Sequence, residues 1–206
     1  MGKERTDRQE RKAAQREAAE RTKRRNAMLW RGALVVVALG AVAFVYRYYT
    51  QRQLLGAVTT ANYPAGQHVA GRAEYKESPP IGGVHNVVWQ NCGIYDMPIH
   101  NEHAVHSLEH GAVWITYRPD LPSGQVEMLK SVASDDFMLL SPYPGLPAPV
   151  VASAWNHQIR LDSAADPSLP AFIAEFKNNP QTTPEFGAPC AGGTSAPATA
   201  ETLAGP

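Results

Sequence analysis

The sequence predicts an α+β domain, with a small mixed or antiparallel sheet and two or three short helices, preceded by one transmembrane helix. Two patterns support this prediction. An apolar run near the start of the 206-residue chain approaches the length that a bilayer requires. Beyond it, β-branched segments and segments of helical spacing follow one another without regular alternation, which is typical of α+β domains.

The formal net charge of zero conceals a basic beginning and an acidic remainder. Residues 1–27 contain ten Lys or Arg and five acids, whereas residues 50–206 contain seven bases and fourteen acids. Positive residues mark the cytoplasmic side of membrane helices. We therefore expect residues 1–27 to be a cytoplasmic basic segment that is solvated or touches lipid headgroups. No aromatic residues are interleaved with its charges, so we do not expect nucleic acid as a partner.

Residues 28–46 are expected to form the transmembrane helix of a single-pass protein of the cell membrane. Arg31 is the one charged residue in this run, and its long side chain can reach the interface. Trp30 and Tyr46 lie where interfacial aromatic residues are common. The charge bias then places everything after Arg47 outside the cytoplasm. A cleaved signal peptide is the alternative, although no small-residue cleavage site follows the apolar run.

The remaining chain divides by composition into three parts. Residues 47–73 are expected to be a polar stalk, and residues 74–190 an extracytoplasmic α+β domain of ordinary domain size. Residues 191–206 are rich in Ala, Gly, Pro and Thr, which predicts a disordered tail.

The elements of the domain are predicted in order from propensity and spacing. β-Branched and aromatic residues indicate strands at residues 84–90, 111–118 and 137–140, and one or two strands within residues 149–161. Apolar residues at helical spacing indicate helices at residues 123–133 and 167–178.

Two cysteines, Cys92 and Cys190, are present. In an oxidising space outside the membrane a disulfide is the default, and it would join the end of the domain to its first third. The alternative is that Cys92 is a thiolate metal ligand.

Histidines are dense at the centre of the chain. His100, His103, His106 and His110 follow at spacings of three, three and four residues. On a helix the last three fall within a 60° sector, and His at i and i+4 can hold one cation. Glu109 would ligate the cation or orient an imidazole ring.

Ligands from elsewhere in the chain would complete such a site. His85 is the preferred remote ligand, since it follows a Pro-Pro-Ile-Gly-Gly loop, and His103 is the next candidate. His157 and the softer Met97 are further possibilities.

Three functions are open for this constellation. The first is transition-metal binding, copper or zinc, for sequestration or for delivery to an exported metalloprotein or envelope membrane complex. The second is a zinc hydrolase of the His-x-x-Glu-His type with Glu109 as the catalytic base, although that motif normally lies on a longer helix. The third is a structural or accessory subunit of an envelope complex in which the histidines pin a turn.

Four segments, SPPIGGVHN, HSLEHGAVWITYRPDL, APVVASAW and TPEFGAPCAGG, together resemble the actinobacterial domain-of-unknown-function family 3105. The resemblance implies an anchored, exported domain and is compatible with a Cys92–Cys190 pair. In that family Gly often follows the Ala-Trp pair, where this chain has Asn156. His100 and His103 lie outside the family pattern. The pattern carries over onto His85, His106, Glu109, His110 and Trp155.

Overall fold

The computed structural model describes residues 2–198, so the expected tail is described only in its first part, and residues 199–206 lie outside the described chain. The chain forms two compact units that divide after Arg52. The first unit consists of one long helix, α1 (Gly2–Leu54), whose last two residues belong to the second unit. Its residues Gln15–Leu54 are long and apolar enough to cross a bilayer, although length and composition would fit a signal sequence as well.

The second unit, called the folded domain below, is built on a six-stranded sheet in the order β1-β8-β7-β5-β6-β4. β5 pairs with β6 in parallel and with β7 antiparallel, so the sheet is mixed, as the predicted α+β class requires. A separate parallel pair joins β2 to β3. The strands are β1 (Thr59–Thr60), β2 (His68–Val69), β3 (His85–Asn86), β4 (Gly93–Ile94), β5 (Val113–Tyr117), β6 (Met138–Pro142), β7 (Val150–Ala154) and β8 (His157–Leu161).

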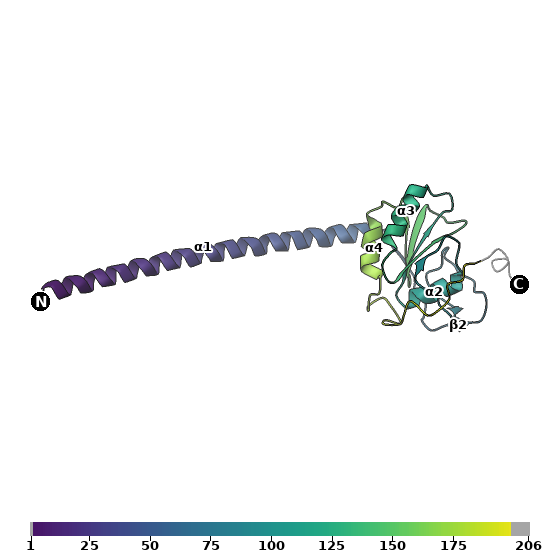
Figure 1. The fold of residues 1–206 in the computed structure, drawn as a ribbon, viewed down its shortest axis with the longest axis horizontal. Coiled ribbons are helices and arrows are strands. Elements are labelled where there is room, and N and C mark those ends of the chain that lie inside the picture. Colours follow the sequence, from purple (N-terminus) through teal and green to yellow (C-terminus); the bar gives the residue numbers. More distant parts are fainter. Residues whose placement is uncertain (1, 199–206) are drawn as a thin grey trace. The chain divides into compact units, whose positions relative to one another are not determined.

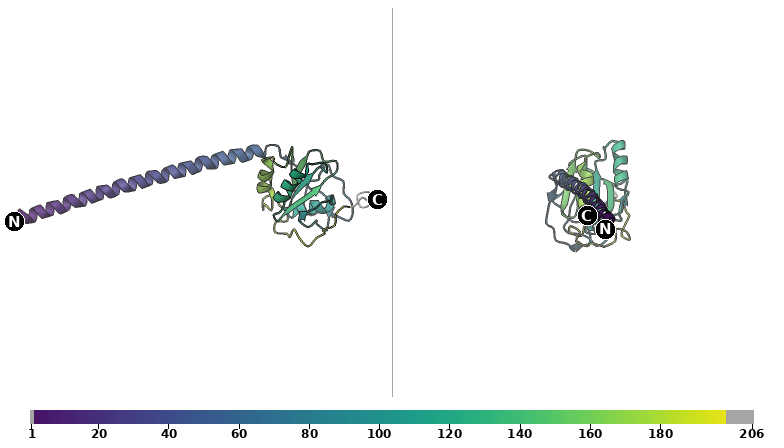
Figure 2. Two further views of the ribbon diagram at one scale, coloured as in Figure 1. Left: turned by 45° about the horizontal axis from the view of Figure 1, so that its top comes forward. Right: turned by 90° about the vertical axis from the view of Figure 1, so that its left-hand side faces the viewer.

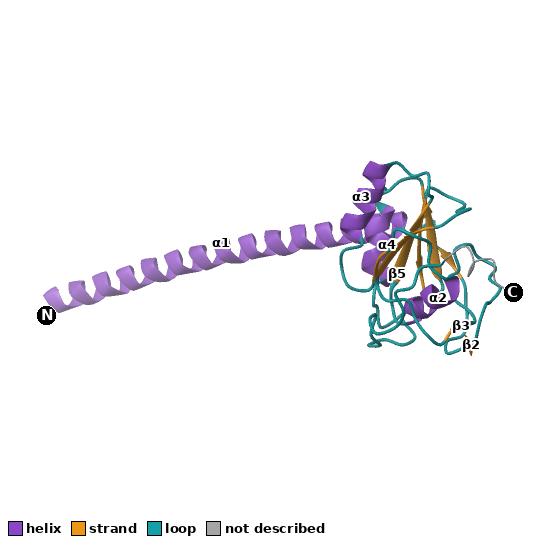
Figure 3. Cartoon of the chain, turned by 45° about the vertical axis from the view of Figure 1, so that its right-hand side comes forward, coloured by secondary structure: helices purple, strands orange, loops and turns teal. Residues whose placement is uncertain are grey.

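Helices cover both faces of the sheet (Figure 1). They are α2 (Asn101–Glu109), α3 (Ser123–Val132) and α4 (Ser168–Phe176). Alternate residues of β5 face opposite sides: Val113 and Ile115 pack with residues of α3 and α4, whereas Trp114 packs with residues of α2. The sheet therefore lies between α2 on one side and α3 and α4 on the other, which can be followed in Figure 3 and in the left view of Figure 2.

The central elements agree with their predictions, and the edges differ. The run at residues 149–161 forms two strands, joined by a tight turn in which Asn156 has φ +64°. Gly and Asn adopt this conformation most easily, so Asn suits the position at which the family that the sequence resembles often has Gly. The strand predicted at residues 84–90 is reduced to β3, because the segment leaves its parallel partner after Asn86.

The segment expected as a stalk takes part in the folded domain. Thr59 and Thr60 pair with β8, and Gly66 donates its backbone N–H to a carboxylate oxygen of Glu109 at 2.6 Å. The first residues of the expected tail pack as well, since the N–H of Thr194 donates to the carbonyl of Trp89. The composition of these two segments did not predict that they belong to the folded domain, because backbone hydrogen bonds hold them there rather than apolar side chains.

Candidate functional site

Helix α2 carries the central histidine segment into the interior. Its apolar residues Ala104, Val105 and Leu108 are fully buried, so the helix is fixed against the sheet. His106 and Glu109, three residues apart, are on neighbouring positions of the helix and are also buried. The helix ends at Glu109, and Gly111 turns the chain into β5 with φ +102°.

Four side chains from three elements converge here, and we call them the inner cluster: His68, His85, His106 and Glu109. One potential ligand atom from each lies within 4.8 Å of the others. The parallel pairing of β2 with β3 sets His68 opposite His85. The three imidazole centroids are 4.8–4.9 Å apart. β2 and β3 lie close to α2 in Figure 3, which brings residues some forty positions apart into one site.

Backbone carbonyls fix how the buried imidazoles are oriented. Nδ1 of His85 lies 2.8 Å from the carbonyl oxygen of Gly83, and Nδ1 of His106 lies 2.7 Å from that of Asn86. A carbonyl oxygen only accepts, so each Nδ1 carries the hydrogen. Nε2 of a neutral ring is then left with its lone pair, which is the arrangement that metal-binding histidines commonly use.

The contact between His85 and Glu109 is completely buried. Nε2 of His85 and Oε2 of Glu109 are 2.9 Å apart, and both side chains are 0% exposed. Despite this proximity, neither atom has a hydrogen-bond partner of acceptable geometry among the described residues. A buried nitrogen and a buried carboxylate oxygen thus face each other without an aligned bond, and such atoms are costly unless something else satisfies them.

The pKa values of the inner-cluster residues are shifted in different directions. Burial lowers the pKa of His85, but contact with Glu109 and the Gly83 carbonyl outweighs it and raises the pKa above the usual value. Burial raises the pKa of Glu109, but His85 and the Gly66 N–H outweigh it and lower the pKa. Burial, reinforced by the surrounding histidines, lowers the pKa of His106 to about 4. These shifts favour the charged forms of His85 and Glu109 and the neutral form of His106.

A second set, which we call the outer cluster, consists of His106, His110 and Glu185. Nδ1 of His110 donates to the carbonyl of Pro189 at 2.7 Å, and its Nε2 lies 3.2 Å from Oε2 of Glu185. The Glu185 side chain is 42% exposed, so this set reaches the solvent. The ring of Trp89 lies 4.9 Å from that of His110 and forms a wall beside the cluster.

The structure brings together most of the residues that the sequence singled out. His85, His106 and Glu109 lie in the inner cluster, and His110 in the outer one. His103 lies in neither, and its Nδ1 donates to the carbonyl of Val88. The ring of Trp155 lies 5.8 Å from that of His85, as a wall of the inner cluster.

His157 and Met97 are not part of either cluster. The ring of His157 stacks on that of Phe176 with centroids 4.3 Å apart. Met97 is half-exposed and belongs to neither set of potential ligands.

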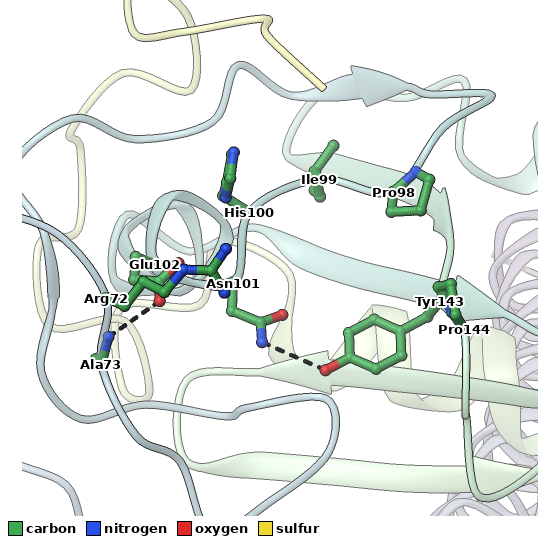
Figure 4. A pocket seen from close by; sticks show the side chains of 9 residues that line it. All are labelled: Arg72, Ala73, Pro98, Ile99, His100, Asn101, Glu102, Tyr143 and Pro144. Atoms are coloured by element: carbon green, nitrogen blue, oxygen red, sulfur yellow. Dashed lines mark hydrogen bonds between the residues drawn. The ribbon is translucent and has the colours of Figure 1, made fainter. Parts of the chain in front are cut away.

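His100 lies beside a different cavity, of about 240 Å³, at the beginning of α2 (Figure 4). There Asn101 Nδ2 donates to the Tyr143 hydroxyl at 3.4 Å, and the Ala73 N–H donates to the Glu102 carboxylate at 3.0 Å. Burial lowers the pKa of His100, as does the charge of His103. The expected row of four histidines is thus divided between a cavity, a surface position and the two clusters.

Sequence reasoning missed His68 and Glu185. His68 stands in the segment expected to be a stalk, and only its register with His85 reveals a role. Glu185 belongs to the segment TPEFGAPCAGG, which carried the family resemblance, but no spacing rule connects it to His110. Its position follows from a hydrogen bond of its backbone N–H to the carbonyl of Glu109.

The predicted disulfide is present between Cys92 and Cys190, whose Cα atoms are 5.4 Å apart. The backbone of Cys92 also donates to the carbonyl of Cys190. Cys92 is therefore not available as a thiolate ligand. Because Pro189 precedes Cys190, the disulfide fixes the carbonyl that orients His110.

Comparison with known families is informative for residues 68–192, which match the protein family of unknown function DUF3105. This match covers more than half of the chain. The chain belongs to the DUF3105 family. Both clusters of this DUF3105 member lie entirely inside the matched region, beginning with His68 itself. No curated protein and no solved structure matches the chain.

Proposed function

We propose that this DUF3105 domain binds one transition-metal ion, copper(II) or zinc, at the inner cluster. It does so for sequestration, or for delivery to an exported metalloprotein or an envelope membrane complex. In this proposal α1 anchors the chain in the cell membrane, with the N-terminus in the cytoplasm and the folded domain outside. The membrane-sized apolar part of α1 and its preceding basic segment support that topology.

The observation that carries the proposal is the buried contact between His85 and Glu109. An ion held by both atoms would satisfy a nitrogen and an oxygen that otherwise face each other without an aligned hydrogen bond. His106 offers a third ligand that is neutral and already oriented, and His68 a fourth from the solvent side. Only an unprotonated nitrogen ligates, so binding requires Nε2 of His85 to carry no hydrogen.

The donor set favours particular metals. Imidazole nitrogen and carboxylate oxygen suit zinc and copper(II), whereas copper(I) prefers thiolate and thioether ligands. The two clusters consist of histidines and glutamates.

Metal binding fits the geometry better than hydrolysis does. Glu109 would have to act as a base on a bound water, but one of its oxygens accepts from Gly66 and the other faces His85. Its side chain is fully buried, and α2 ends at this residue. The variant Glu109→Gln separates the two functions, since a hydrolase would lose turnover while keeping its metal.

Equilibrium metal binding to the purified full chain in detergent micelles tests the proposal. After dialysis against micromolar copper(II) or zinc, we expect the wild type to retain one ion per chain. His106→Gln should weaken binding by about 100-fold, as loss of a ligand or its support does. His103→Gln is the matched control and should bind like the wild type.

Two results would refute the proposal. One is that the wild type retains neither metal. The other is that His106→Gln binds as the wild type does. If His106→Gln lowered only the melting temperature, the histidines would instead be structural, as in an accessory subunit.

A further inference from the structure

The inner and outer clusters share a single residue, His106. It could bind an ion together with His85 and Glu109 on one side, or together with His110 and Glu185 on the other. The ring of His106 lies 4.9 Å from that of His85 and 4.6 Å from that of His110. The two sets are therefore adjacent parts of one row of ligands.

His106 can serve only one of the two sets at a time. Its Nδ1 donates to the carbonyl of Asn86, so Nε2 is its one free ligand atom. An imidazole nitrogen has one lone pair and binds one ion. Two ions cannot both be held through His106, and the two sets are alternative positions for a single ion.

Exposure falls along the row from Glu185 inward to His85 and Glu109, and it rises again at His68, the exposed member of the inner cluster. Glu185 is 42% exposed, His110 is 3% exposed, and His85 and Glu109 are completely buried. The backbone of Glu185 is held at the end of α2, because its N–H donates to the carbonyl of Glu109. An acidic group thus stands at the outer end of the row, hydrogen-bonded through its backbone to the end of α2, whereas the exposed residue at the other end is an imidazole.

We propose that the outer cluster is a transfer site through which the ion enters and leaves the inner cluster. The ion is first held by Glu185 and His110, and His106 then stays bound while these two ligands are exchanged for His85 and Glu109. In the exchange two ligands replace two others, any hydrogen on Nε2 of His85 passes to water, and no oxidation state changes. This inference rests on the proposed metal binding at the inner cluster and adds the route by which the metal moves.

Stopped-flow uptake and release of zinc by the full chain in detergent micelles tests the route, with a chelator added to start release. Glu185→Gln removes the charge and leaves the backbone hydrogen bond in place. Because one route serves both directions, we expect uptake and release both to slow by about tenfold, the lower range for loss of electrostatic guidance. Glu175→Gln, an exposed carboxylate in neither cluster, is the matched control and should keep both wild-type rates.

The outcomes distinguish a role of Glu185 in transferring the ion from a role as a ligand of the final site. If Glu185 were simply a ligand of the final site, Glu185→Gln would release zinc faster, and the proposed route would be wrong. Unchanged rates would also overturn it and would indicate passage beside the exposed His68. Two zinc ions bound tightly per wild-type chain would contradict the sharing of His106. No zinc bound by the wild type would refute the proposed function itself, and with it the transfer route.

Discussion

His106 differs from an ordinary buried histidine in having a fixed tautomer and a low pKa together. The carbonyl of Asn86 holds the hydrogen on Nδ1, while burial and the neighbouring histidines lower the pKa to about 4. The spacing of histidines predicted that His106 and His110 share one side of a helix. It could not predict the tautomers, because these depend on carbonyls of Asn86 and Pro189 that are distant in sequence.

Acid should destabilise the metal-free protein through His106. The unfolded chain has a histidine pKa near 6.5, above the folded value of about 4. The unfolded state therefore takes up a proton first, and stability is lost as pH falls from 6.5 towards 4, by up to about 3 kcal/mol. Urea denaturation with chelator at pH 6.5 and 4.5 should show a smaller loss for His106→Gln. Equal losses in the two proteins would contradict this. His100, whose pKa burial also lowers, acts in the same direction in both.

Gly111 should not tolerate a side chain. Its φ is +102°, and a Cβ would lie 2.9 Å from Thr183 and 3.0 Å from the Cα of Asn178. We expect Gly111→Ala to lower the free energy of unfolding by about 2–4 kcal/mol, from backbone strain and the clash. Gly124→Ala is the control, because that position in α3 is open, and it should be neutral or stabilising. Similar denaturation midpoints for the two variants would show that the turn after α2 is not constrained.

Among the elements, those with a clear apolar pattern were predictable. α3, α4 and β5 lie close to their predicted ranges because each buries a regular set of side chains. β2 and β3 were not predictable as a pair, since each has two residues and they are held by backbone pairing. The inner cluster depends on that pair, so the sequence did not reveal His68, although it singled out His85, His106 and Glu109.

The disulfide should stabilise the folded domain strongly, because it closes a loop between residues 98 positions apart. Loss of this constraint on the unfolded chain is worth about 4 kcal/mol in the chain-entropy view. The double variant Cys92→Ser and Cys190→Ser should lower the free energy of unfolding by about that amount in urea denaturation. A loss below about 1 kcal/mol would indicate that backbone hydrogen bonds alone hold the C-terminal segment.

For the whole molecule, composition predicted the α+β class and a membrane-sized apolar helix, both of which the structure contains. It misplaced where the folded domain begins, because residues 59–73 carry few apolar side chains and still supply β1, β2 and the Gly66 contact to Glu109. A polar segment can be held in a fold by backbone hydrogen bonds, and these cannot be predicted from amino-acid composition.

The proposed topology predicts which end of the chain is accessible in intact cells. Protease added outside cells should remove a tag at the C-terminus and leave a tag at the N-terminus intact, because basic residues retain the N-terminus in the cytoplasm. Lysed cells provide the control, in which both tags are cleaved. A C-terminal tag that is cleaved only after lysis would contradict an extracytoplasmic domain.

Anomalous diffraction from crystals of the zinc-loaded or copper-loaded protein tests the central claim most directly. We predict one anomalous peak at the inner cluster, about 2.0–2.2 Å from Nε2 of His85, Nε2 of His106 and a carboxylate oxygen of Glu109. Loaded crystals in which His85 and Glu109 remain in direct contact and no peak lies between them would contradict it.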